Sequence, residues 1–501
     1  MVFPMRRLLP VLVLLLSAES LHAQMFTVPD PMLKLLFAEG TAPHSRVARM
    51  AQILTDSIGP RAAGADGYKS AVEWMSGLYR EWGMSTETDA LGTARGWRSG
   101  LVRFEVVAPR PRVLNAALVP GSAGTNGEVI GTVASLPFFR DSVAANAWLA
   151  QSRGRFVLMS YAEPTCWPDE ALEELNAGGS TDRLRTLQQA GRRNWQARLQ
   201  NVGPAAFVEK LQAAGAAGII TLASSTDAVS TLAGLPHLEL GCEDYALLSR
   251  LVTNPSARLR LQADAAAAPD QPVVNLIARM QGRERAGEYV LLTAPFATAS
   301  SGPGATESAA ATATVLEAMR ILRNSYPQPK RTIVAAHWGV PPASAQGANA
   351  FISKHPDIVR GLAAGFSITG AGKVNEIRGL GFPGPGVYMG EWLSRMPDEL
   401  TSGVRLDVPG LPDAANTIDA SFVCRGMPIV ALRTAASTKH AVSGTAADTY
   451  DKILSENLRT NAILLATLAY QAAEADAPFD RKQRIMPTDT AGQYIKWPSC
   501  K

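Results

Sequence analysis

Hydrophobic positions along this chain follow two spacings, and each spacing predicts a different kind of element. Residues 46–84 divide into two helical patterns around a Gly-Pro-Arg turn, and the second pattern has one apolar face: Ala71, Trp74, Met75 and Leu78. From Val273 to about Ala475, β-branched runs of strand length alternate with helical segments: VVNLIARM, EYVLLTAPF, KRTIVAAHW and GMPIVALR. This alternation predicts a largely parallel sheet covered by helices on both faces, with any site at the carboxyl ends of its strands.

A block in the middle of the chain has a different texture. Short alternating runs such as EVIGTVASL and GRFVLMSY predict strands, and the segments AAFVEKLQAAGAAGIITL and LPHLELGCEDYALLSRLV each predict a helix beside a strand. The block therefore has an α/β core of its own and is predicted to be an inserted domain. The expected organisation is a signal peptide (1–23), the N-terminal part of a main domain (24–113), the insert (114–265), the rest of the main domain (266–475) and a polar tail (476–501).

The N-terminal segment has the pattern of a secretory signal peptide. Arg6 and Arg7 precede the apolar run 8–16, and a small-residue site ending at Ala23 predicts cleavage before Gln24. An uncleaved N-terminal anchor is the alternative. No later apolar run approaches the roughly 18 residues that a membrane helix needs. We therefore expect an exported mature protein, periplasmic or extracellular, that has no membrane span.

Charge and cysteine content narrow the classes of function. The formal net charge is +4 and the pI is near 8.8, but the arginines are scattered rather than clustered. A nucleic-acid surface, which needs clustered Lys and Arg, is therefore not predicted. The four cysteines show no metal-binding spacing: Cys166, Cys242, Cys424 and Cys500. An oxidising compartment permits one or two disulfides among them, and the sequence leaves their pairing open.

Several motifs in a fixed order carry a resemblance to a known family. After the Gly-Pro-Arg turn and the inserted block come NLIARMQG, GATES, LEAMRILR, PKRTIVAAHWG and TAADTYDKI. In this order they resemble the co-catalytic zinc exopeptidases of metallopeptidase family twenty-eight, especially its carboxypeptidase Q-like and aminopeptidase members. The resemblance implies an α/β fold with a mixed, mostly parallel sheet sandwiched by helices. It also implies that the insert is a protease-associated domain, because GRFVLMS and AAGAAGIITL are similar to pieces of that domain.

Peptide hydrolysis at a two-zinc site needs His and carboxylate ligands, together with a second carboxylate that takes a proton from the metal-bound water. The resemblance assigns the general base to Pro341. It assigns the metal-ligand positions to Pro295, Glu307, Pro342, Ser367 and Gly444. Of these five residues only Glu307 carries a carboxylate, so the resemblance implies an inactive homologue without zinc or another cofactor. Its expected partner is a peptide or a protein, bound in the former catalytic cleft or by the insert.

Two alternatives remain open at this point. The chain as a whole resembles an active zinc-dependent amino- or carboxypeptidase, which is the competing function. The remaining polar residues could also form a replacement metal or hydrolytic site in the cleft, and the candidates are Glu307, His337, Asp419, His440 and Asp448. Against that site, His337 precedes the end of its strand and is expected to point into the core. Asp448 is expected to cap the helix that begins near Tyr450.

Overall fold

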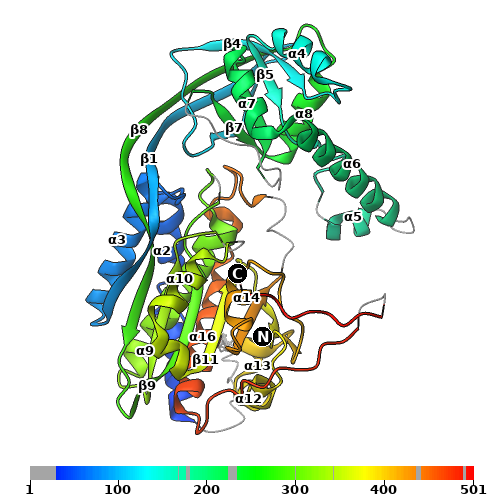
Figure 1. Ribbon diagram of the computed structural model, residues 1–501. Coiled ribbons are helices and arrows are strands. Elements are labelled where there is room, and N and C mark those ends of the chain that lie inside the picture. The colour runs from blue at the N-terminus through cyan, green and yellow to red at the C-terminus, as the bar shows by residue number, and fades with distance from the viewer. Residues whose placement is uncertain are drawn as a thin grey trace, which may run out of the picture.

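The structure, a computed structural model, describes residues 30–167, 169–175, 181–223, 234–299, 301–341, 344–435, 442–488 and 492–500. Figure 1 shows two lobes joined by a long two-stranded ribbon made of β1 (Ser85–Ala108) and β8 (Arg258–Met280). The two strands pair in antiparallel fashion along nearly their whole length. Each strand therefore belongs to the sheet of both lobes, and this shared ribbon holds the lobes together.

The larger lobe is built on one sheet. Its order is β13 (Arg405–Asp407), β12 (Val374–Arg378), β14 (Ile429–Thr434), β11 (Leu362–Thr369), β9 (Arg285–Pro295), β10 (Arg331–Trp338), β8 and β1. The central strands β14, β11, β9 and β10 are parallel, and β13 is parallel to β12. Strand β12 is antiparallel to β14, and β8 is antiparallel to β10 and β1. The predicted mixed, mostly parallel sheet is therefore confirmed.

Helices cover both faces of this sheet. One group comprises α1 (Pro31–Gly40), α2 (Val47–Gln52), η1 (Ile53–Ile58), α3 (Asp66–Glu81), η2 (Ala305–Ala309), α9 (Ala310–Ser325) and α16 (Ser455–Glu474). The opposite face carries α10 (Gln346–Lys354), α11 (Pro356–Gly361) and α14 (Ile418–Val423). Strand β10 is buried throughout, with Ile333 and Ala335 in the first core and Val334 and Ala336 in the second. This two-sided burial explains its unbroken apolar run.

Shorter elements complete the larger lobe near its far edge and its C-terminal side. They are α12 (Gly384–Ser394), α13 (Asp398–Thr401) and the short 3-10 turn η3 (Tyr450–Lys452). Within the described residues, no helix has both the length and the apolar character that a membrane crossing requires. The predicted signal peptide lies outside the described residues.

The smaller lobe has its own strands, helices and hydrophobic core. The strands are β2 (Arg112–Leu114), β3 (Ala116–Leu118), β4 (Val129–Ser135), β5 (Arg155–Leu158), β6 (Gly218–Leu222) and β7 (His237–Leu240). The helices are α4 (Ser142–Ala150), α5 (Asp169–Leu175), α6 (Thr181–Val202), α7 (Pro204–Ala213) and α8 (Cys242–Leu251). Phe156, Ile220 and Leu238 form part of one core cluster, which also includes Trp97 and Phe104 of the ribbon strand β1. The core of this lobe therefore extends onto the ribbon.

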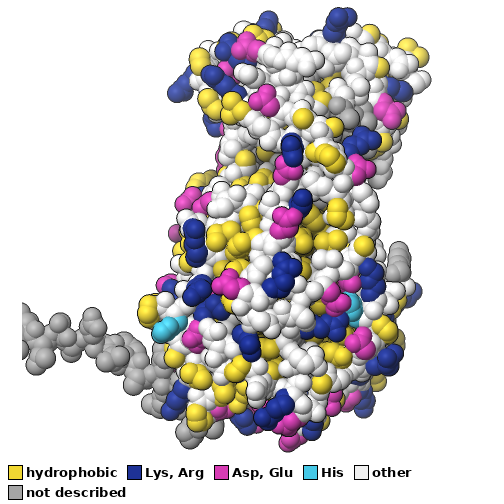
Figure 2. All heavy atoms as spheres, turned by 90° about the vertical axis from the view of Figure 1, so that its left-hand side faces the viewer, with side chains coloured by type: hydrophobic (Ala, Val, Ile, Leu, Met, Phe, Trp, Pro, Cys, Tyr) yellow, Lys and Arg dark blue, Asp and Glu magenta, His cyan; other side chains and the backbone are white. Residues whose placement is uncertain are grey.

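The face of the molecule on the side of α3, β1 and β8 carries mixed charge. Figure 2 shows basic and acidic side chains interspersed over both lobes on this face, with hydrophobic side chains gathered between the lobes. This distribution agrees with the scattered arginines of the sequence. No large surface of one sign appears on this face.

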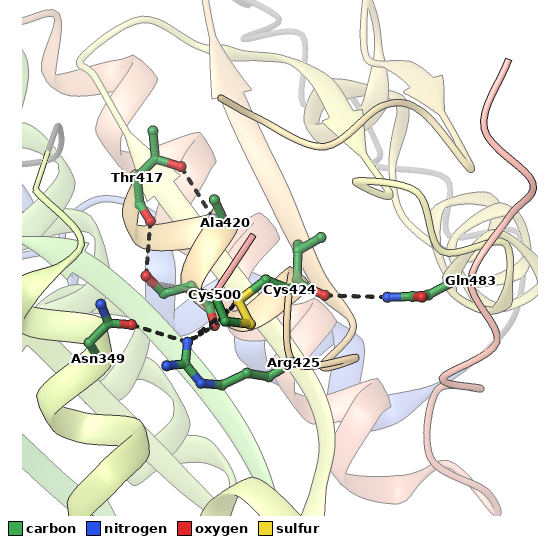
Figure 3. Close-up of a disulfide and its surroundings, with 9 residues drawn as sticks. Asn349, Thr417, Ala420, Cys424, Arg425, Gln483 and Cys500 are labelled. Carbon is green, nitrogen blue, oxygen red and sulfur yellow. Dashed lines mark hydrogen bonds between the residues drawn. A yellow bond between two sulfur atoms is a disulfide. The ribbon is translucent and has the colours of Figure 1, made fainter. Parts of the chain in front are cut away.

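Two disulfides fix the pairing that the sequence leaves open. Cys166 bonds to Cys242 in the smaller lobe, and Cys424 bonds to Cys500 in the larger lobe. The second bond ties the end of the C-terminal tail to the residue that follows α14 (Figure 3). Trp497 of the same tail lies beside Phe382, with ring centroids 5.8 Å apart. The polar tail is therefore fastened onto the larger lobe at two points.

Candidate functional site

A cavity of about 360 Å³ opens at the carboxyl ends of the central parallel strands. Its walls come from β9, β10, β11 and β14, from the loop before α14, and from α14 itself. The lining residues are Thr293, Pro295, Trp338, Ser367, Ile368, Thr369, Asp413, Thr417, Ile418, Asp419 and Arg433. This edge of a parallel sheet is where ligands bind in open α/β folds, because the strand ends and the following loops converge there.

Asp419 is the most engaged polar residue of the cavity. It lies in the first turn of α14, and the N-cap residue Thr417 accepts a hydrogen bond through Oγ1 from the Ala420 amide at 3.2 Å. Asp419 Oδ2 accepts hydrogen bonds from Ser367 Oγ at 2.9 Å and from Arg433 Nη2 at 3.0 Å. The carboxylate is thus held between the ends of β11 and β14.

A second carboxylate, Asp413, also pairs with Arg433. Arg433 Nη2 also donates to Asp413 Oδ2, and Arg378 Nη1 donates to Asp413 Oδ1 at 3.0 Å. Burial raises the pKa of Asp419, although the positive charge of Arg433 opposes the rise. Burial lowers the pKa of Arg433, but the neighbouring carboxylates Asp419 and Asp413 outweigh burial and raise it. Arg433 therefore stays charged at any physiological pH and neutralises the wall around it.

Glu307 and Asp448 lie together beside the start of α9, and neither lines the cavity. Glu307 Oε2 accepts from Ser443 Oγ at 3.4 Å. Asp448 is fully buried. Burial and the negative charge of Glu307 raise the pKa of Asp448 to about 6, although hydrogen bonds from Thr306 and the positive charge of Arg61 oppose the rise.

The expectation that Asp448 caps the helix near Tyr450 is wrong. Asp448 Oδ1 accepts from the Thr306 amide at 2.9 Å and its carbonyl accepts from the Ala305 amide at 3.1 Å, so it caps η2, which continues into α9. Neither η3 nor α16 has a side-chain cap. The reason is spatial, since the unpaired first amides of η2 face residue 448 across the fold.

His337 packs in the core of the larger lobe. It is fully buried, and its Nε2 lies 2.7 Å from the hydroxyl of Tyr79 on α3. Burial lowers the pKa of His337 to about 3, so its imidazole is neutral. Successive residues of a strand point to opposite faces, which places His337 opposite Trp338, the residue of β10 that does line the cavity.

The structure separates the residues that the sequence singled out. Pro295, Ser367 and Asp419 share the cavity, whereas His337 does not line it. Gly444 lies in a turn at φ 79°, and the carbonyl of Pro341 accepts a hydrogen bond from the Ser344 amide at 2.9 Å. Pro342 and His440 lie outside the described residues. Within the described ranges, no three His, Cys, Asp or Glu side chains gather in a way that could hold a metal ion.

Two charged residues that line the cavity, Asp413 and Arg433, are not among the residues predicted from the sequence. Arg433 ends the apolar run GMPIVALR, and a charge at the carboxyl end of a buried strand is a signal that could have identified it. Asp413 lies in a loop without a recognisable motif. Only the fold brings it next to Arg433.

Comparison with known proteins identifies the larger lobe. Residues 275–469 match the family model for peptidase family M28. This segment belongs to peptidase family M28. Carboxypeptidase Q of Rattus norvegicus is 22% identical over 348 residues, which cover 65% of this chain and 67% of that protein. The family predicted from the ordered motifs is therefore confirmed.

Two solved structures of peptidases are similar to this chain. A peptidase M28 precursor from Shewanella amazonensis has a TM-score of 0.61 at 19% identity, covering 90% of this chain and 98% of its own. BSAP, a zinc aminopeptidase from Bacillus subtilis, has a TM-score of 0.49 at 16% identity, covering 90% of this chain and 97% of its own. The first of these likenesses supports the M28 fold across both lobes.

Proposed function

We propose that this chain is an exported, non-catalytic member of peptidase family M28 that binds a peptide or protein in the cavity and carries no pair of zinc ions. One observation carries the proposal. The carboxylate of Asp419, which faces the cavity, is already neutralised by Arg433 and hydrogen-bonded by Ser367. Arg433 therefore supplies the positive charge that a bound metal ion would supply to Asp419 in a metal site.

The residues at the positions implied for zinc ligands do not fit a two-zinc site. Pro295 offers no donor atom, Ser367 offers a neutral hydroxyl that already donates to Asp419, and Gly444 has no side chain. Zinc sites in proteins use Cys, His and carboxylate ligands, usually three or four for each ion. A cationic guanidinium in the same cavity also disfavours a divalent cation by charge repulsion. No step of the proposed function passes through a metal.

The cavity has the size and lining of a ligand pocket. Its volume of about 360 Å³ falls in the range of small-molecule sites, which runs from roughly 300 to 1,000 Å³. Apolar surface comes from Pro295, Ile368 and Ile418, and hydroxyl groups come from Thr293 and Thr369. A short peptide segment offers both kinds of complementary group in its side chains and its backbone.

Two features support export. The first 23 residues have the pattern of a signal peptide, and all four cysteines are paired. Disulfides of this kind persist in oxidising compartments and are rare in the cytosol.

A binding and turnover experiment on the mature chain tests the proposal. The purified protein is incubated with a mixture of short peptides, with and without added zinc, and bound and released species are measured by mass spectrometry. We expect selected peptides to be retained intact and no terminal amino acid to be released. Chelator-sensitive release of terminal amino acids would instead establish an active amino- or carboxypeptidase.

A pair of variants locates the binding. Ile418→Trp fills the cavity and is expected to abolish retention of peptides. Val387→Trp makes the same kind of change at a position on α12 that is 76% exposed and outside the cavity, so it is expected to bind as the wild type does. Equal retention by both variants would place the ligand elsewhere on the molecule.

A further inference from the structure

Resting on the proposed function, we infer that the cavity selects neutral, amide-bearing ligands, namely internal or end-blocked peptide segments, over peptides that present a charged terminus there. Three properties of the cavity lead to this selectivity. They are the charge balance of its wall, the cost of burying a new charge against that wall, and the hydrogen-bonding groups that remain unpaired.

The charged wall of the cavity is internally compensated. Charges of alternating sign follow one line of contacts, formed by Arg378, Asp413, Arg433 and Asp419. Two guanidinium groups face two carboxylates, so the row has no net charge. Two further carboxylates act on this row. Asp407 lies 3.5 Å from Arg378 Nε, but its side chain is 41% exposed and water screens it. Glu376 acts on Arg433 and is itself paired with Arg405. Of the residues that line the cavity, only Asp413, Asp419 and Arg433 carry a full charge.

A charged peptide terminus would meet only charges that already have a partner of opposite sign in this wall. Both oxygens of Asp413 accept from arginines, and Asp419 Oδ2 accepts from both Arg433 and Ser367. Taking an ammonium or a carboxylate out of water is costly, and an opposite charge that is already paired offsets little of that cost. A neutral ligand avoids this cost entirely.

The unpaired hydrogen-bonding groups suit an amide. Thr293 Oγ1 and Trp338 Nε1 belong to cavity-lining residues that are 1% and 0% exposed, and neither atom has a hydrogen-bond partner in the part of the chain that is described. An indole N–H can only donate, whereas a threonine hydroxyl can donate and accept. A peptide group supplies one carbonyl acceptor and one N–H donor, so it offers the kind of partner that each of these two atoms lacks. Burying a polar atom without a partner is unfavourable, and such a ligand removes that penalty.

Matched peptide libraries test the selectivity. The full mature protein is titrated with dipeptides that are N-acetylated and C-amidated, and with the same dipeptides unblocked, and dissociation constants are measured by calorimetry. We expect the best blocked dipeptide to bind at least tenfold more tightly than its unblocked counterpart. A smaller difference or the reverse preference overturns the inference while leaving peptide binding intact. If neither library binds, the proposed function fails and the inference fails with it.

Two substitutions test the stated causes. Thr293→Val keeps the shape of the side chain and removes its hydroxyl, so affinity for the blocked dipeptide should fall by about threefold to tenfold, as for one neutral hydrogen bond. Thr314→Val, the same change in α9 outside the cavity, should leave that affinity unchanged. Arg433→Gln leaves two carboxylates without their shared partner and should shift the preference toward unblocked dipeptides. An unaltered preference in Arg433→Gln would refute charge compensation as the cause.

Discussion

Replacing Asp448 by Asn should change how the stability of the larger lobe depends on pH. Asp448 is buried beside Glu307 and caps the start of η2 through the Thr306 amide. The amide of an asparagine can still accept that hydrogen bond through its oxygen. The substitution therefore removes the titrating charge while keeping the cap and nearly the same side-chain volume.

The magnitude follows from the pKa of Asp448, which burial raises from 3.8 to about 6. Because the folded state holds the proton more tightly than the unfolded state, protonation stabilises the fold as the pH falls. This contribution is fully present below pH 3.8 and is lost as the pH rises through about 6. A shift of roughly two units at about 1.4 kcal/mol per unit gives about 3 kcal/mol between the two limits.

Urea unfolding of the two proteins at several pH values between about 4 and 8 measures this difference. Relative to Asp448→Asn, the wild type should gain about 2 to 3 kcal/mol of unfolding free energy as the pH falls across this interval. Asp451→Asn, an exposed carboxylate three residues further along, is the matched control and should follow the wild type. Identical pH profiles for wild type and Asp448→Asn would refute the reasoning.

Two further predictions concern the ion pairs and the tail. Arg433→Met should destabilise the larger lobe by about 3 kcal/mol, because it leaves two largely buried carboxylates without their partner. Adding Asp419→Asn should recover part of that loss in the same unfolding assay, and full additivity would contradict the pairing. Cys500→Ser removes the disulfide to Cys424, which lies 76 residues away in sequence. The free energy of unfolding should fall by about 4 kcal/mol, because the unfolded chain regains the entropy that the closed loop removes. The matched change Cys166→Ser removes the other disulfide and should lower the urea concentration at which the smaller lobe unfolds.

The strands of the larger lobe could be predicted because their residues are buried on both faces. All eight residues of β10 are buried, so its apolar run is unbroken and easy to recognise. The ribbon could not be recognised in the same way. The segment ADAAAAPDQP within β8 has no clear alternation, and its extended form depends on pairing with β1 over a distance in sequence that no local pattern reveals.

The candidate site was predictable where a motif fixed the position. Pro295 and Ser367 were identified through the ordered motifs, and both line the cavity. Asp419 of α14 contacts Ser367 of β11 and Arg433 of β14, and the parallel pairing of these two strands brings its partners together from separate segments. Asp448 shows the same limit, since the helix that it caps begins far from it in sequence. Contacts between distant segments are set by the fold rather than by local spacing.

The most direct test of the non-catalytic account is the zinc content of the purified mature protein, measured by mass spectrometry after equilibration with zinc and removal of loosely bound metal. The account predicts no stoichiometric zinc in the wild type. About two zinc ions per chain, retained together with release of terminal amino acids from peptides, would contradict it.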